Sequence, residues 1–101
     1  MVKKSWKVIF RQRTIRKIRN IAIYIESRGY PENALRFANA LYNFGESLGE
    51  YPEKYPICRN PIWAKRNLRC AVFRKDYLFI YKIFEKEVVI YNVVNARTMA
   101  L

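Results

Sequence analysis

The sequence contains no histidine and little negative charge: eight Asp and Glu residues stand against 20 Lys and Arg. Histidine is the usual proton donor and acceptor near neutral pH, so any catalysis must use Lys, Arg, Tyr, a carboxylate or groups of a partner. No apolar run approaches the roughly 20 residues that cross a bilayer. Residues 1–7 carry charge but no apolar stretch follows them, which argues against a secretory signal. We therefore expect a cytoplasmic protein with no membrane partner.

Cysteine is also scarce. Cys58 and Cys70 have no spacing typical of metal ligands, and no histidine is present to complete a site. We interpret them as two ordinary thiols in a reducing cytosol. The sequence therefore predicts neither a metal nor a small-molecule cofactor.

Positive charge is abundant, with a formal net charge of +12 in only 101 residues. This length predicts a single domain, residues 1–101, and a hydrophobic content of 51% argues against disorder. A small domain with this charge is expected to bind a polyanion or an acidic protein. On charge alone, ribosomal RNA, mRNA, DNA, an anionic membrane and an acidic polypeptide all satisfy that expectation.

The last third of the chain is dense in β-branched and aromatic residues, which favours strands. Charged breaks at 74–76 and 85–87 are short enough for tight turns, so we expect antiparallel strands at about 67–74, 77–84 and 87–96. Within these strands apolar residues point to both faces, as at Leu78 to Tyr81. Tyr81 and Tyr91 are expected to be core residues.

The first half predicts a strand at 5–10 beside that meander, followed by two helices. In residues 12–28 an apolar stripe recurs at helical spacing; residues 31–48 carry a second one. Gly29 can end the first helix and Pro31 can begin the second. The expected stripes are Ile15, Ile18, Ala22 and Ile25 in the first helix, and Leu35, Ala38, Leu41, Tyr42 and Leu48 in the second.

The predicted fold is α+β, in the order β-α-α-β-β-β, with a helical hairpin packed on one face of a four-stranded, mainly antiparallel sheet. Two helices can cover one face of such a sheet, and little of the chain is left for the other. An exposed apolar face of that size would be an association site.

Basic residues gather at the N-terminal end, where no acidic residue precedes Glu26. The region is a phosphate-binding surface or simply a solvated helix face. A long connection, 49–66, interleaves aromatic and basic residues, which can stack on bases or can pin the loop to the domain. The N-terminal basic set is Lys3, Lys4, Lys7, Arg11, Arg13, Arg16, Lys17 and Arg19. The candidate nucleic-acid-binding residues are Arg13, Arg16, Lys17, Lys65, Arg66 and Lys82.

Taken together, these features resemble the RelE/ParE toxin family of bacterial type II toxin–antitoxin systems. The resemblance covers essentially the whole chain. It rests on the basic strand–helix opening, the hairpin that ends in Phe-Gly-Glu-Ser-Leu at 44–48, the Pro-rich loop at 51–61, and the strand patterns at 77–81 and 87–91. It implies a cognate antitoxin as partner and no cofactor.

The resemblance implies one of two targets. RelE-like toxins cleave mRNA on the ribosome with basic side chains, and ParE-like toxins act on DNA gyrase without catalysis. Arg69 and Arg97 match basic positions of the RelE pattern approximately and are the candidate catalytic residues. Leu78 stands where that pattern carries an arginine, and Leu78→Arg is expected to raise activity or leave it unchanged. Ribosome-dependent mRNA cleavage is the leading hypothesis; the alternatives are gyrase inhibition and a catalytically decayed antitoxin-binding module.

Overall fold

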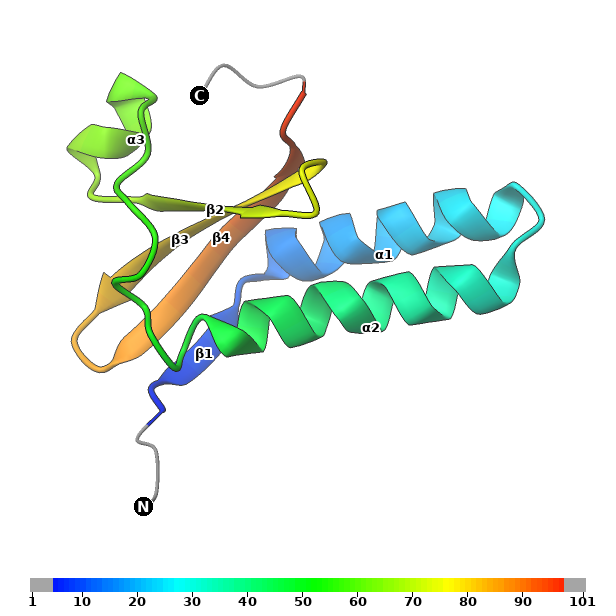
Figure 1. Cartoon of the computed structure of the whole chain (residues 1–101), viewed down its shortest axis with the longest axis horizontal. Helices are drawn as coiled ribbons and strands as arrows, with labels where there is room; N and C mark the ends of the chain where they lie inside the picture. Colours follow the sequence, from blue (N-terminus) through cyan, green and yellow to red (C-terminus); the bar gives the residue numbers. More distant parts are fainter. Residues whose placement is uncertain (1–4, 98–101) are drawn as a thin grey trace.

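A computed structural model describes residues 5–97, and it confirms the predicted α+β fold (Figure 1). Lys3 and Lys4 of the predicted basic set lie outside the described residues. A short helix within the long connection is the element that sequence patterns missed. The elements in chain order are β1 (Lys7–Phe10), α1 (Gln12–Ser27), α2 (Pro31–Ser47), α3 (Pro61–Lys65), β2 (Arg69–Phe73), β3 (Tyr77–Phe84) and β4 (Glu87–Asn95).

The four strands form one mixed sheet in the order β1-β4-β3-β2. β2, β3 and β4 are antiparallel neighbours, as the short turns require, whereas β1 joins β4 in parallel. Positive φ angles at Arg74, Lys75 and Glu85 make these turns tight. The predicted meander and the placement of the first strand beside it are confirmed.

The helical hairpin turns at Gly29, whose φ of 91° is readily adopted by glycine. The Gly29 N–H donates to the carbonyl oxygen of Glu26 at 2.9 Å and caps the end of α1. Pro31 then opens α2, with Glu32 in the first turn. Figure 1 shows the two helices side by side, with the tip of the hairpin extending past the sheet.

The two apolar stripes are partly different from those predicted. In α1, Thr14 and Ile18 are buried, whereas Ile15 is 36% exposed. The hydroxyl of Thr14 bonds to the sheet and turns that residue inward, which moves Ile15 out of the interface. In α2, Leu35 is 65% exposed because it lies toward the tip of the hairpin, beyond the cover of the sheet.

The helix-covered face of the sheet holds the larger core. Ile18 and Leu41 from the helices pack there with Phe79, Tyr81 and Ile90 of the sheet. Tyr81 is fully buried, so its predicted place in the core is confirmed. The ring centroid of Phe44 lies 5.0 Å from those of both Phe73 and Phe79, which ties α2 to β2 and β3.

The opposite face is better covered than the sequence indicated. Cys58 and Leu68, which flank α3, pack on Leu78 and Ile80 and bury all four side chains. The expectation that little chain remains for this face is therefore wrong. The segment 56–70, hereafter the arm, supplies the cover.

The cysteines are also not the free thiols that the sequence suggested. Cys58 and Cys70 form a disulfide across the base of the arm, with a sequence separation of 12. This corrects the interpretation from cysteine spacing, because the fold brings the start of the arm beside β2. Within residues 5–97, no helix has the length and apolar character needed to traverse a lipid bilayer.

Candidate nucleic-acid interface

A β-bulge in β4 shapes the sheet face opposite the hairpin. Tyr81 pairs with Ile90 and Ile80 pairs with Asn92, which leaves Tyr91 as the extra residue. A bulge re-aims side chains that would otherwise alternate between the two faces. Tyr91 and Asn92 therefore both line the same side of the sheet.

The bulge also fixes the start of α1. The carbonyl oxygen of Ile90 accepts hydrogen bonds from the Arg11 N–H at 3.1 Å and from the buried Thr14 hydroxyl at 3.0 Å. These bonds hold the first turn of α1 against β4. The Arg11 side chain is thereby held against the Tyr91 ring, and Arg13 and Arg16 line the same hollow as that ring.

A cleft of about 670 Å³ results between the first turns of α1, the bulge and the arm. We call it the basic cleft. Leu68, Ile80 and Val94 give it an apolar floor. Within residues 5–97 no carboxylate lines it. Its polar and aromatic lining consists of Arg11, Gln12, Arg13, Arg16, Trp63, Arg66, Tyr91 and Asn92.

The ring of Tyr91 lies between two guanidinium groups. Arg11 Cζ lies 4.9 Å from the ring centroid and Arg66 Cζ lies 5.6 Å from it. These cation–π contacts orient both guanidinium groups and join α1 to the arm across the cleft. The four arginines place four positive charges around one cleft.

Such an arrangement fits a phosphodiester chain. Guanidinium forks match phosphate oxygens, and aromatic rings offer faces on which bases stack. An anion would also relieve the mutual repulsion of the four arginines. The cleft has the chemistry to bind single-stranded nucleic acid and to stabilise negative charge on a phosphate.

Three of the six predicted nucleic-acid-binding residues line this cleft: Arg13, Arg16 and Arg66. The other three do not. Lys17 is half-buried on α1 but does not line the cleft, and Lys65 is exposed at the end of α3. Lys82 lies on the same face of β3 as Ile80 but farther along the strand.

The two candidate catalytic residues lie apart. Arg69 pairs with Tyr81, so it lies on the helix-covered face, where its Nη1 donates to the carbonyl oxygen of Tyr55 at 2.6 Å. Beside it, burial raises the pKa of Tyr81 to about 12, and the Tyr81 hydroxyl donates to the carbonyl oxygen of Pro52 at 2.6 Å. Arg69 therefore has a structural contact away from the basic cleft.

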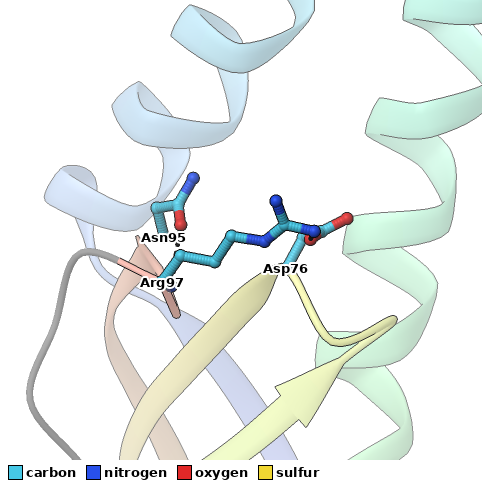
Figure 2. Close-up of polar contacts among 3 residues, drawn as sticks. All are labelled: Asp76, Asn95 and Arg97. Atoms are coloured by element: carbon cyan, nitrogen blue, oxygen red, sulfur yellow. Dashed lines mark hydrogen bonds and ion pairs between the residues drawn. The ribbon is translucent and has the colours of Figure 1, made fainter.

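Arg97 lies just beyond the end of β4. Its Nη2 is 3.2 Å from Oδ1 of Asp76, and its backbone N–H donates to the Asn95 side chain at 2.9 Å (Figure 2). Asp76 is in the β2–β3 turn, at the end of β3 that lies away from Tyr81 and Arg69. The structure does not bring Arg69 and Arg97 together.

Leu78, the position where the family pattern has an arginine, is 1% exposed under the arm. An arginine there would bury its charge among apolar groups, so the expectation that Leu78→Arg maintains activity is wrong: the substitution should destabilise the fold.

Sequence reasoning missed Tyr91 and Asn92 as surface residues of the cleft, and it gave Arg11 no role of its own. A period-two pattern puts Tyr91 in the core, because nothing in the local sequence marks the bulge. Among residues 5–97, no three His, Cys, Asp or Glu side chains come together as metal ligands.

Comparison with known proteins places this geometry in a family. The model of the ParE toxin of type II toxin–antitoxin systems, parDE, matches residues 8–99. The chain therefore belongs to the ParE toxin family of type II toxin–antitoxin systems. No curated protein matches the sequence.

Two solved structures share the fold. One is from the chromosomal ParDE toxin–antitoxin system of P. aeruginosa, with a TM-score of 0.76 and 13% identity over 90% of this chain and 96% of that one. The other is from the toxin–antitoxin complex RelBE2 of Mycobacterium tuberculosis, with a TM-score of 0.63 and 22% identity over 90% of this chain and 91% of that one. At these identities the likeness concerns the fold alone.

Proposed function

We propose that this toxin inhibits translation by binding mRNA on the ribosome in the basic cleft and promoting its cleavage. The cleft itself carries the proposal: four arginines, two aromatic rings and no carboxylate among the described residues. Phosphate contacts supply affinity without sequence preference, and stacking on Tyr91 and Trp63 favours single strands over duplexes.

The cleft supplies one part of the cleavage chemistry. Attack by a ribose 2′-OH requires activation of that hydroxyl, stabilisation of the phosphate and protonation of the leaving oxygen. The arginines stabilise the phosphate. Since the chain has no histidine, we assign the proton transfers to groups of the ribosome or the RNA, which makes cleavage ribosome-dependent.

A second candidate, inhibition of DNA gyrase without catalysis, is favoured by a different observation. Arg69 and Arg97 lie at different places and are each engaged within the chain. A toxin that acts by binding alone needs no convergent catalytic set. Both candidates place the toxin in the cytoplasm.

We further propose that a cognate antitoxin binds this chain. Both solved structures above come from toxin–antitoxin systems. The net charge of +12 favours an acidic partner, and Ile57, Ile62 and Val72 leave apolar surface exposed around the arm and β2. Co-expression with the product of the adjacent gene should yield a stable complex, whereas a toxin that remains a soluble, unbound monomer would contradict this.

Two assays on one preparation separate the candidate functions. In a translating extract, the proposal predicts mapped cuts in mRNA that disappear in Arg13→Ala/Arg66→Ala and persist in the matched control Arg19→Ala/Arg36→Ala. A gyrase supercoiling assay runs beside it. Intact mRNA with inhibited supercoiling would replace the first candidate with the second, and no effect in either assay would leave a decayed antitoxin-binding module.

A further inference from the structure

The arm is a nearly closed loop with both ends at the disulfide. Cys58 lies near its start and Cys70, in β2, ends it. Two backbone hydrogen bonds lie at the same base: Cys58 N–H donates to the Leu68 carbonyl at 2.9 Å, and Cys70 N–H donates to the Pro56 carbonyl at 3.2 Å. The connection between the arm and the sheet is therefore concentrated in a few residues.

Trp63 of α3 is half-buried and packs against the cluster of Cys58, Leu68, Leu78 and Ile80, but otherwise the outer part of the arm has little anchorage. No residue of α3 is buried, and the helix is capped locally by Asn60 Oδ1, which accepts from the backbone N–H groups of Ile62 and Trp63. Leu68 is the deeply buried residue between the two cysteines. The base of the arm thus determines where α3 lies.

This arm supplies one wall of the basic cleft. Trp63 and Arg66 belong to it, whereas Arg11, Arg13 and Arg16 belong to the start of α1. Arg66 contacts the Tyr91 ring of β4 from the arm, and Arg11 contacts the same ring from the start of α1. Any loosening at Cys58 and Cys70 would move a stacking ring and a cation away from the other three arginines.

The two cysteines are unequally accessible to a small reductant. They line an apolar hollow of about 270 Å³ between the arm and β2, which Val72, 46% exposed, and Ile57, 39% exposed, leave open to solvent. Cys58 is 4% exposed, and Cys70 is less deeply buried. The first attack of a thiolate is therefore expected at Sγ of Cys70.

We propose that the Cys58–Cys70 disulfide is a redox-operated clamp that sets the affinity of the basic cleft for single-stranded nucleic acid. The proposal rests on the function proposed above. Oxidised, the clamp holds Trp63 and Arg66 in the cleft; reduced, it releases the arm and weakens binding.

The reductant is a dithiol, the class of compound that keeps cytosolic thiols reduced. One thiolate of the dithiol bonds to Cys70 Sγ and expels Cys58 as a thiolate, which takes up a proton. The second thiolate of the dithiol then attacks the dithiol's first sulfur, which is bonded to Cys70 in the mixed disulfide. This attack expels Cys70 as a thiolate, which is protonated in turn. Two electrons pass to the protein, and the dithiol becomes a disulfide. Oxidising conditions would therefore favour the tight-binding toxin.

The test compares the oxidised toxin with the same preparation reduced by dithiothreitol, its free thiols counted by mass after alkylation. Amide hydrogen exchange in residues 59–68 reports on the arm without any ligand. A labelled single-stranded RNA oligonucleotide reports on the cleft. Reduction should speed amide exchange in residues 59–68 and weaken RNA binding about tenfold. Tenfold is at the lower end of the affinity loss expected when one stacking ring and one phosphate contact are removed.

Cys58→Ser/Cys70→Ser is the control and should match the reduced toxin in both readouts while no longer responding to dithiothreitol. Circular dichroism checks that the variant is folded. If it is not, the comparison of oxidised with reduced wild-type toxin still tests the proposal. Unchanged exchange on reduction would overturn the clamp. Faster exchange with unchanged RNA affinity would also overturn it. If reduction speeds exchange but the oxidised toxin binds no RNA, the disulfide restrains the arm but does not control RNA binding. That result would also refute the proposed function separately.

Discussion

The salt dependence of RNA binding measures how many cleft arginines contact phosphate. Each contact contributes about −0.7 to the slope of log affinity against log salt on a single strand. If the four cleft arginines each contact one phosphate, the slope is about −3, and raising salt from 50 to 200 mM weakens binding about 50-fold.

Arg13→Ala/Arg16→Ala should make this slope shallower, at about −1.4, since two phosphate contacts are lost. Both side chains are exposed on α1, so the variant should keep the stability of the wild-type protein. Arg19→Ala/Arg36→Ala removes the same net charge outside the cleft and should leave the slope near its wild-type value. Lys17→Ala should do the same, because Lys17 does not line the cleft.

Fluorescence anisotropy with a labelled single-stranded RNA at several salt concentrations gives these slopes. Equal slopes for Arg13→Ala/Arg16→Ala and the wild-type toxin would show that the start of α1 is merely a solvated basic face. Equal losses of RNA affinity in Arg13→Ala/Arg16→Ala and in its control would show that affinity depends on net charge and not on the cleft.

Three further results are expected. Tyr81→Phe should remove a pH dependence of folding stability. Because burial favours the neutral phenol of Tyr81 in the folded state, the stabilisation from this phenol is complete below pH 10 and is lost as the pH rises toward about 12. Thermal unfolding of both proteins across that pH range would detect the difference. A variant with the wild-type alkaline profile would contradict this. Gly49→Ala should destabilise the fold by about 1–3 kcal/mol in urea unfolding, because a Cβ there would overlap the Trp6 carbonyl oxygen, whereas Ser47→Ala should change stability by less than about 0.5 kcal/mol. The resemblance to RelE-like toxins gives Arg97 a role from outside the basic cleft, and on that expectation Arg97→Ala should abolish growth arrest. The protein should stay folded, since the exposed pair with Asp76 contributes at most about 1 kcal/mol. Continued arrest, equal to that of Lys86→Ala, would remove Arg97 from the candidate catalytic residues.

The sequence predicts the fold well because its signals are local and agree with one another. Gly29 and Pro31 mark the hairpin, and the charged turns at 74–76 and 85–87 separate the antiparallel strands. Helix faces are predicted less well, since Ile15 and Leu35 fit an apolar stripe but lie where tertiary packing leaves them exposed.

The candidate site depends on contacts that local patterns do not encode. The bulge at Tyr91 becomes evident only from the pairing of β3 with β4. Arg66 reaches Tyr91 and shares the basic cleft with the arginines of α1 because the arm folds back over the sheet, and the same folding joins Cys58 to Cys70. Charge patterning alone found Arg13, Arg16 and Arg66, but it could not separate them from Lys17, Lys65 and Lys82.

Mapping a bound RNA directly tests the central claim that the basic cleft is the nucleic-acid interface. Titration of the ¹⁵N-labelled toxin with a single-stranded RNA oligonucleotide should shift backbone amide signals in residues 11–16, 63–68 and 91–94. The tip of the hairpin at 27–31 and the turn at 74–76 should stay unperturbed. Shifts centred on those two regions, or none at RNA concentrations that saturate binding, would contradict the account.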